Sequence, residues 1–311
     1  MNFKLNPHQR SDAAAKQILV EQFLILQNNT QPLIDDKDTE CLHDFRIAVR
    51  RTRVLLNQLP GIFPQRTTVQ FQKKFKQLGT ITTQMRDLDV LLSEFSGYRA
   101  MISKHKRNYL ETLKTCIQQQ RDFQFKRLKH YLRSRSHGKL IHHWQVFLDK
   151  PCPKNTRLQN ALLPIDEFLS ARTWHWYRRV LRDGAKITDE TAAEKLHALR
   201  KNCKTLRYLI EFGSGLHSKK KLKKATKIMK RLQNILGKHQ DLHVHINYLR
   251  KFESLLAQDE SLNEETTEVI QNIIDRLNLQ QMQCRDKFQK AFAEFSSETN
   301  QVFFAALFKS R

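Results

Sequence analysis

Hydrophobic residues recur along almost the whole chain at intervals of three and four positions, the spacing of one face of an α-helix. In the segment LHDFRIAVRRTRVLL (42–56), that face carries Phe45, Val49, Thr52 and Leu56. Glycine and proline are scarce, at 8 and 7 residues in 311, so few turns interrupt the pattern. We therefore predict an all-α protein built from long amphipathic helices.

A second segment with the same pattern follows 154 positions further along the chain. LHALRKNCKTLRYLI (196–210) matches the segment above, and at the same offset IMKRLQNILGKHQDLHVHI (228–246) matches KFKQLGTITTQMRDLDVLL (74–92). Self-similarity at one fixed offset indicates an internal duplication. Because the repeated unit is far longer than the roughly 20–45 residues of a solenoid repeat, we interpret each copy as a helical bundle.

The duplication predicts two tandem, antiparallel four-helix bundles related by a pseudo-twofold axis. The first half covers residues 10–150, the second covers 155–311, and they join near DKPCPKNT at 149–156. Short connections favour up-and-down packing within each half. The expected elements are a first helix (11–28 and 165–182), a motif helix (39–58 and 190–212), a third helix (64–83 and 216–237), a fourth helix (86–97 and 240–257) and a long closing segment (100–135 and 262–295).

The net charge of the chain indicates that this helical protein binds a partner. The chain has 55 lysines and arginines against 31 acids, a formal net charge of +24. Such an excess opposes the compact state by self-repulsion, and a polyanionic partner is the simplest reason to carry it. Nucleic acid, an anionic membrane surface and inorganic polyphosphate are the candidates. No stretch reaches the roughly 18 apolar residues of a membrane span, and the N-terminus lacks a signal-peptide pattern, so we expect a cytoplasmic protein.

The cations are concentrated on single helix faces. Arg46, Arg50 and Arg53 share one face of the motif helix with His43, although like charges at this spacing repel. No acid within the motif relieves the repulsion, which indicates that a ligand supplies the countercharge. The same holds for the third helix and for the second copy of both. The predicted polyanion-binding residues are His43, Arg46, Arg50, Arg53, Arg66, Lys73, Lys76, His197, Arg200, Lys204, Arg207, Lys220, Lys223, Lys227 and Lys230.

Other kinds of site have weaker support. The five cysteines are scattered without a CxxC pair, which indicates reduced structural thiols. His239, His243 and His245 include an i, i+4 pair suited to a metal, but no acidic third ligand is evident. Asp87 and Asp241 are interpreted as helix caps or as hydrogen-bond partners of the fourth helix. No phosphate-binding glycine loop is present. With acids kept away from the basic motifs, we expect binding without catalysis, metal or cofactor.

The duplicated motifs resemble the CHAD family (conserved histidine α-helical domain). The resemblance rests on His-x-x-Arg-x-x-x-Arg/Lys-x-x-Arg and on the later RDLDV segment, and it covers nearly the whole chain as a single CHAD domain, 1–311. It implies a fold with a basic central groove or pore and the binding of inorganic polyphosphate, with association with polyphosphate granules as a further expectation. The second copy has HQDLHV in place of an Arg-Asp pair. The Glu-x-Glu-x-Lys triplet of the CYTH triphosphatase domain is not found, so the resemblance implies a stand-alone binding protein.

Three alternatives stay open at this point. A generic polyanion-binding or nucleic-acid-binding protein would share the charge, but it predicts aromatic side chains or a recognition helix among the cations. The aromatic cluster of Trp174, Trp176 and Tyr177 lies away from the motifs. A metal-dependent phosphohydrolase would need carboxylates in the groove. The basic segment 99–137 either widens the cationic surface or is the solvated back of the bundle.

Overall fold

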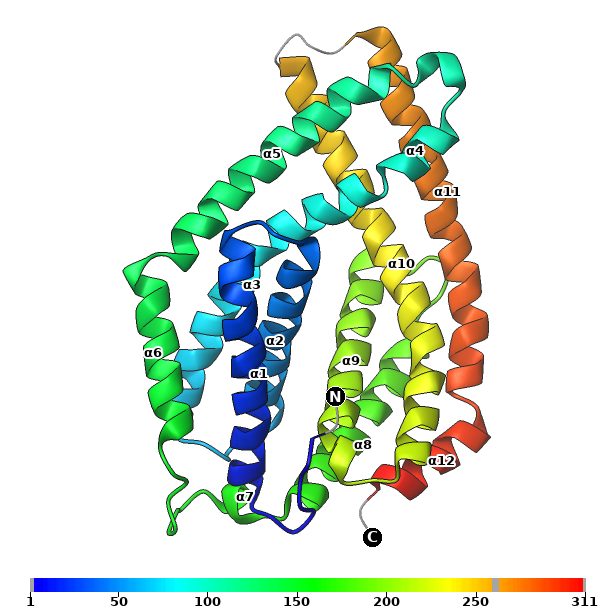
Figure 1. Ribbon diagram of the computed structural model, residues 1–311. Coiled ribbons are helices and arrows are strands. Elements are labelled where there is room, and N and C mark those ends of the chain that lie inside the picture. Colours follow the sequence, from blue (N-terminus) through cyan, green and yellow to red (C-terminus); the bar gives the residue numbers. More distant parts are fainter. Residues whose placement is uncertain (1–2, 259–262, 310–311) are drawn as a thin grey trace.

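The computed structural model describes residues 3–258 and 263–309, and every regular element within them is a helix. A single isolated bridge pairs Arg10 with Pro164. The prediction of an all-α protein is confirmed (Figure 1). None of the described helices is long and apolar enough to cross a membrane.

The helices of the first half of the chain turn back on one another, and so do those of the second half (Figure 1). The first half contains α1 (Ser11–Ile34), α2 (Thr39–Gln58), α3 (Gln65–Ser93), α4 (Phe95–Met101), the 3₁₀ turn η1 (Lys104–Lys106), α5 (Tyr109–Leu132), α6 (Arg135–Asp149) and α7 (Gln159–Leu162). The second half contains α8 (Ile165–Gly184), α9 (Ala193–Phe212), the 3₁₀ turn η2 (Gly213–Gly215), α10 (Lys219–Gln258), α11 (Glu264–Phe295) and α12 (Glu298–Phe308).

Three pairs of helices begin at the offset found in the sequence. Helices α8, α9 and α10 each start 154 positions after α1, α2 and α3, and the two motif helices α2 and α9 both have 20 residues. This regularity supports the predicted duplication, which itself stays a prediction. The same holds for the domain boundaries; the chain between α6 and α7 is non-helical where a junction was expected.

The third and fourth helices expected in each half are in fact one continuous helix. Helix α3 has 29 residues and α10 has 40. No proline lies near either expected break, and the one glycine there, Gly237, does not interrupt α10. The predicted closing segment of the first half is wrong in the other direction. It is divided into α4, η1, α5 and α6 instead of forming one long helix. The expected start of the second closing segment, residue 262, lies outside the described residues.

Large aromatic side chains hold each bundle together. On the first half, Trp144 of α6 packs edge-on against Phe71 and Phe75 of α3, with ring centroids 4.6 and 4.9 Å apart. On the second, Tyr177 of α8 stacks on Phe304 of α12 at 4.2 Å. Rings of this size remove more apolar surface from water than any other side chains. All five belong to one hydrophobic core that runs through both halves.

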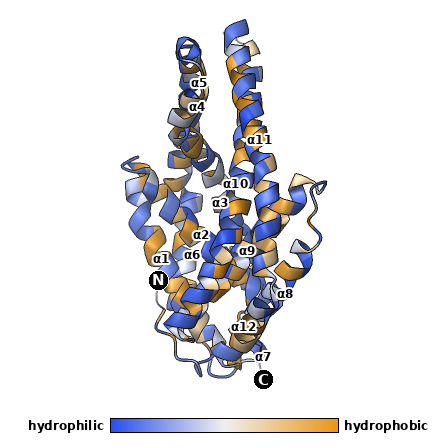
Figure 2. Cartoon of the chain, turned by 90° about the vertical axis from the view of Figure 1, so that its right-hand side faces the viewer, coloured by the Kyte–Doolittle hydropathy of each residue, from blue (hydrophilic) through white to orange (hydrophobic). Residues whose placement is uncertain are grey.

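A second core lies beyond the two bundles, where the long helices project together (Figure 2). It combines Phe95 and Tyr98 of α4 with Leu249 and Phe252 of α10 and with the first part of α11. Because α4 and α5 come from the first half and α10 and α11 from the second, this core ties the halves to each other. The long uninterrupted helices make that contact possible.

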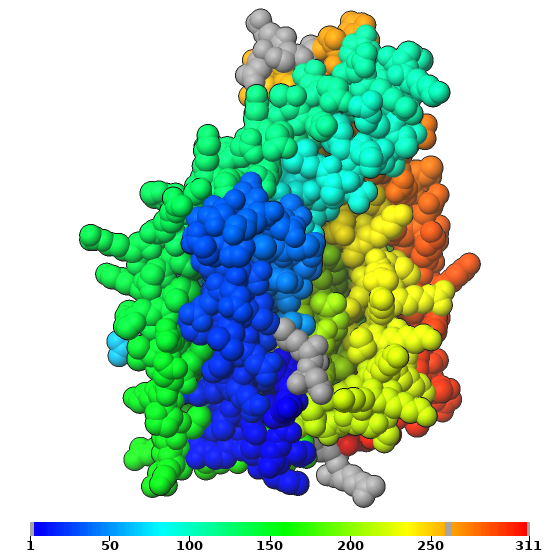
Figure 3. Space-filling model, viewed as in Figure 1, coloured from blue at the N-terminus to red at the C-terminus, as the bar shows by residue number. Residues whose placement is uncertain are grey.

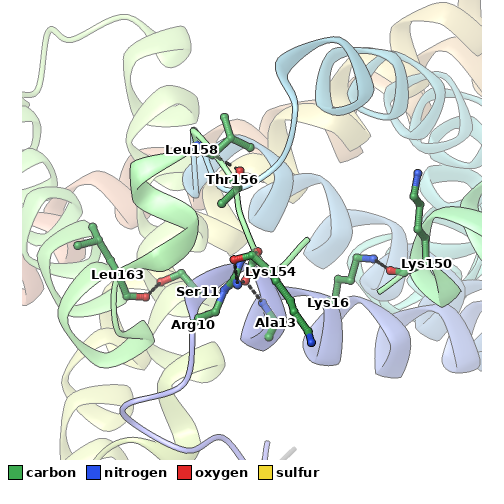
Figure 4. Close-up of polar contacts among 10 residues, drawn as sticks. Arg10, Ser11, Ala13, Lys16, Lys150, Lys154, Thr156, Leu158 and Leu163 are labelled. Carbon is green, nitrogen blue, oxygen red and sulfur yellow. Dashed lines mark hydrogen bonds and ion pairs between the residues drawn. The ribbon is translucent and has the colours of Figure 1, made fainter. Parts of the chain in front are cut away.

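The junction between the halves is fastened to the beginning of α1 (Figure 4). The hydroxyl of Ser11 donates to the carbonyl of Leu163 over 2.8 Å, and Arg10 Nη1 donates to the carbonyl of Lys154 over 3.2 Å. Lys16 Nζ donates to the carbonyl of Phe147 at the end of α6, 2.8 Å away. The connection is therefore held against the first bundle rather than extended from it.

Candidate functional site

The motif helices α2 and α9 lie next to each other in the middle of the molecule (Figure 1). Asp38 caps the start of α2 by accepting a hydrogen bond from the amide of Glu40. Figure 3 shows the seam where the first half meets α10 on one face. On each motif helix the apolar face is buried and the motif cations beside it are half-buried. The cationic edges of α2 and α9 can therefore face each other across the interface between the two halves.

Arg50 shows that they do meet. Its charge lowers the pKa of Arg46 and Arg53 on its own helix, after the larger effect of burial. It also lowers the pKa of Arg200 and Lys204 on α9, again after burial. We call the set that these interactions link, together with the motif residues beside them, the central cationic cluster: His43, Arg46, Arg50, Arg53, His197, Arg200, Lys204 and Arg207.

Arg46 reaches from α2 to α3, where it finds only neutral partners. Its Nη1 donates to the hydroxyls of Thr82 and Thr83 over 3.0 and 3.1 Å. Burial, followed by the charge of Arg50, lowers the pKa of Arg46 to about 10. Within the described part of the chain, no carboxylate comes within ion-pair distance of this guanidinium. Its charge is thus held in place without being neutralised.

Lys204 is placed still less favourably for a charge. Burial lowers its pKa to about 6, and Arg50 and Arg200 act in the same direction. A desolvated lysine among like charges holds its proton weakly. Asp241 acts in the opposite direction, and a bound anion would add to its effect by placing more negative charge beside Lys204.

Arg53 is accommodated by a glycine on the neighbouring helix. A Cβ atom added to Gly79 of α3 would lie 2.9 Å from Arg53 Nη1. A contact that short forces the guanidinium to move. The glycine therefore leaves room for Arg53 beside α3.

Two carboxylates do lie in the cluster, so the expectation that acids keep away from the basic motifs is wrong. Asp241 Oδ1 is 3.3 Å from Arg200 Nη2. Burial raises the pKa of Asp87 to about 6; Arg46 opposes the rise and Asp241 adds to it. The two aspartates, one from each half, are therefore near each other.

Their position shows that the interpretation of both aspartates as helix caps is wrong, whereas the alternative of a hydrogen bond agrees with the contact between Asp241 and Arg200. Asp87 lies inside α3 and Asp241 lies inside α10, because each helix continues past the predicted break. Four arginines, Arg46, Arg50, Arg53 and Arg200, still outnumber these two carboxylates even when Lys204 is neutral. The cluster keeps an excess of positive charge.

Arg51 of α2, which is outside the predicted set of binding residues, connects the two motif helices. Its Nη2 lies 2.7 Å from Glu211 Oε2 on α9, and Arg207 Nε lies 3.3 Å from the other oxygen of Glu211. The guanidiniums of Arg51 and Arg207 lie 5.8 and 5.0 Å from the ring centre of Tyr208. The i, i+4 spacing of Arg207 and Glu211 was the signal in the sequence for this arrangement. Arg207 thus has a carboxylate partner within the chain.

His43 and His197 begin the two motifs. Each interacts with the same position of the repeat, which is Arg86 in the first half and Gln240 in the second. His197 Nδ1 is hydrogen-bonded to Gln240 Oε1. Burial lowers the pKa of His43, and Arg86, which occupies the position equivalent to Gln240, lowers it further. Burial likewise lowers the pKa of His197. Both imidazoles are therefore easily kept neutral until an anion approaches.

The remaining predicted residues lie on the surface and apart from these contacts. Arg66, Lys73 and Lys76 on α3 and Lys220, Lys223, Lys227 and Lys230 on α10 are all exposed. Near the start of α10, Lys219, Lys221 and Lys224 are exposed as well. None of the seven predicted residues forms an ion pair with the acids that the structure describes. The structure separates them, as a solvated stripe, from the half-buried cluster.

The other candidate features have structural roles. His245 Nδ1 is hydrogen-bonded to the hydroxyl of Tyr98 at 2.7 Å, and residues 3–258 and 263–309 contain no group of three or more metal-binding side chains suited to an ion. Trp176 and Tyr177 are buried in the core, so they offer no exposed platform for bases.

Comparisons with known proteins agree with this fold. A family profile described as CHAD domain matches residues 17–250. The crystal structure of the CHAD domain from the plant Ricinus communis is similar with a TM-score of 0.76 and 24% identity, over 94% of both chains. PptA from Streptomyces chartreusis is similar with a TM-score of 0.70 and 11% identity, over 91% of this chain and 99% of that one. A search of curated proteins found no match.

Proposed function

This chain belongs to the CHAD domain family, and on that premise we propose that it binds inorganic polyphosphate at the central cationic cluster without cleaving it. Some members of the family bind polyphosphate. The observation that carries the proposal is the position of Arg50, whose charge acts on Arg200 and Lys204 across the boundary between the halves. A linear polyanion laid along that boundary would contact cations of both halves at once.

The chemistry of the cluster suits a repeating phosphate chain. Arginine presents a planar fork of donors that matches phosphate oxygens, and lysine offers a compact charge that adapts to many positions. A polymer with one repeating unit has no sequence to be read, so it requires charge and spacing rather than base-specific contacts. The mutual repulsion of Arg46, Arg50 and Lys204 is relieved when phosphates enter, which makes binding favourable beyond the direct contacts.

The site offers little for hydrolysis. Enzymes that cleave phosphoanhydride bonds usually hold divalent metal ions on carboxylates. Three carboxylates are described at the cluster, Asp87, Asp241 and Glu211; Asp241 is engaged with Arg200, and Glu211 with Arg51 and Arg207. We therefore assign the protein a binding role, and we propose that this role is attachment to polyphosphate granules in the cytoplasm.

A competition experiment tests the proposal. Labelled long-chain polyphosphate is bound at rising salt and challenged with orthophosphate, ATP and duplex DNA in equal phosphate amounts, and with heparin in an equal amount of negative charge. We expect polyphosphate to stay bound at physiological salt while DNA fails to displace it. Equal competition by DNA would make the cluster a generic polyanion surface and overturn the proposal.

Two variants locate the site and have the same change in charge. Arg46→Ala with Arg50→Ala removes two cluster cations, whereas Lys73→Ala with Lys76→Ala removes two exposed ones. Binding should be abolished in the first variant and largely kept in the second. The absence of cleavage is tested separately by incubating bound polyphosphate with Mg²⁺ or Mn²⁺ and measuring its chain length. Shortening of the polymer would show hydrolysis.

A further inference from the structure

A pocket of about 530 Å³ lies between α4, α10 and α11, next to the central cationic cluster but outside it. Tyr98 and Met101 come from α4, Gly237 and His245 from α10, and Leu277 from α11. Its volume falls within the roughly 300–1,000 Å³ typical of small-molecule sites. The proposed polyphosphate function uses none of these five residues.

His245 gives the pocket a buried polar group that the protein itself does not fully use. The residue is 6% exposed, and its Nδ1 is hydrogen-bonded to the hydroxyl of Tyr98, which is 2% exposed. No described residue is hydrogen-bonded to His245 Nε2. Burial lowers the pKa of His245, so its imidazole is neutral near pH 7. His245 lines the pocket, and in the tautomer whose Nδ1–H donates to the Tyr98 hydroxyl, Nε2 can accept a hydrogen bond from a bound donor.

Two carboxylates accompany this acceptor. Glu94 and Asp241 both line the pocket, and both act on His245 by raising its pKa against the effect of burial. Both are exposed, which places them at the rim. Only Oδ1 of Asp241 is engaged with Arg200. Among the described lining residues, Lys238 is the one cation. On a chain of net charge +24, two carboxylates beside a neutral imidazole form an unusual environment that favours a cation.

The floor of the pocket is open at a glycine that helix packing does not require. Gly237 lies in the middle of the 40-residue helix α10, where glycine is less favourable than alanine. A Cβ atom added there would meet no other atom within 4 Å. The missing side chain therefore serves no close approach of helices, and its effect is to leave space in the pocket.

From these features we infer that the pocket binds an aliphatic amine of the diamine or polyamine class. One ammonium group pairs with Glu94 and Asp241 at the rim and donates a hydrogen bond to His245 Nε2. The methylene groups lie along Tyr98, Met101 and Leu277. The inference does not rest on polyphosphate binding, although Asp241 borders both sites and would place the amine beside the polyanion.

Isothermal titration of the full chain with 1,6-diaminohexane and with spermidine tests this inference, and hexane-1,6-diol serves as the neutral control. The wild-type protein should bind both amines and not the diol. Gly237→Leu fills the pocket and should weaken amine binding at least tenfold. Gly138→Leu is the matched control, because a Cβ atom at Gly138 of α6 also meets nothing within 4 Å, and it should bind like the wild type.

A second variant keeps the test informative if Gly237→Leu does not fold. Glu94 is exposed, so Glu94→Gln leaves packing intact, and it should weaken amine binding about tenfold by removing one carboxylate. Absence of amine binding by the wild type, equal binding of the diol, or unchanged binding in Glu94→Gln would each overturn the assignment.

Discussion

Arg51 of α2 and Glu211 of α9 form an ion pair of 2.7 Å that joins the two motif helices beside the central cationic cluster. Glu211 also contacts Arg207, so one carboxylate serves two guanidiniums. The side chains of Arg51 and Glu211 are only 14% and 25% exposed. Two adjacent residues of one helix thus have opposite electrostatic environments. Arg51 is neutralised within the protein, whereas Arg50 is surrounded by other cations.

This contrast predicts opposite effects for substitutions at two neighbouring positions. Arg51→Ala should lower the free energy of unfolding by about 1–3 kcal/mol, because Glu211 is deprived of a charged hydrogen-bond partner at a partly buried site. Arg50→Ala should leave the free energy of unfolding unchanged or raise it, because repulsion on four neighbouring cations is removed. Chemical denaturation of both variants measures the difference.

The same two substitutions should affect polyphosphate binding in the opposite order. Arg50→Ala should weaken it about 10–100-fold, as expected when a charge-assisted hydrogen bond of about 1.5–3 kcal/mol is removed, while Arg51→Ala should weaken it far less. Glu211→Gln is the control for the ion pair and should reproduce the lower stability of Arg51→Ala. Unfolding of Arg50→Ala at ambient temperature would mean that Arg50 is a structural residue.

The acidic and basic groups of the cluster predict stronger binding at lower pH. Asp87 and Lys204 both have a pKa of about 6, so between about pH 7.5 and 5.5 Asp87 becomes neutral and Lys204 gains a positive charge. The affinity for polyphosphate should rise at least about tenfold over this range, since one pKa unit corresponds to about 1.36 kcal/mol. Binding isotherms at constant ionic strength measure it. Asp87→Asn should bind more tightly at about pH 7.5 and show a shallower pH profile; a flat wild-type profile would contradict this account.

Without ligand, the same two groups should limit stability around neutral pH. The pKa of Asp87 is raised from 3.8 in the unfolded chain to about 6, so its contribution to stability is complete below pH 3.8 and disappears as pH rises through 6. The pKa of Lys204 is lowered from 10.5 to about 6, so its contribution is present above pH 10.5 and disappears as pH falls toward 6. Thermal melting should therefore show Asp87→Asn stabilised at about pH 7.5 but not at about pH 3.5. Lys204→Met should gain most below pH 6, and an equal gain of either variant at every pH would contradict the assignment.

Much of this architecture was predictable because it depends on local periodicity. The faces of α2 and α9 follow from hydrophobic spacing, and the predicted start of α8 is correct, whereas the predicted starts of α9 and α10 are each three residues early. The continuous helices were missed because the change from a cationic face to RDLDV resembles a new element, although no proline or turn separates them. Only packing reveals that Asp87 and Asp241 come together, since they lie 154 positions apart in the chain. The Tyr98–His245 hydrogen bond was unpredictable for the same reason.

Gly79 offers a way to disturb the cluster without removing a charge. Gly79→Ala should raise the free energy of unfolding by about 0.5–1 kcal/mol, as alanine does in a helix interior, provided that Arg53 moves aside. That movement follows from the 2.9 Å approach of the new Cβ atom to Arg53 Nη1. Polyphosphate binding should weaken several-fold, so stability and binding change in opposite directions. In an Arg53→Ala background, Gly79→Ala should cause no further weakening of binding; additive effects would mean that Gly79 acts through another residue.

The exposed stripe on α10 and the half-buried cluster should differ in how salt affects them. Lysines that contact a polyanion release condensed counterions, so removing each such lysine reduces the slope of log K against log salt concentration by about 1. Replacing Lys220, Lys223 and Lys227 with glutamine removes three exposed charges that have no described ion-pair partners. If the stripe guides and extends binding, the slope should fall by about 3, so the loss of affinity should be largest at low salt and should shrink as the salt concentration rises, when the cluster alone holds the polymer.

An unchanged slope in this triple variant would mean that the stripe is solvated surface and that the ligand is held by the cluster alone. Arg50→Ala, measured over the same range of salt, is the reference for damage to the cluster. If the triple variant weakened binding as much as Arg50→Ala at every salt concentration, the stripe would belong to the site itself. That result would contradict the separation between exposed and half-buried cations, because a residue outside the site acts through long-range charge, which salt screens.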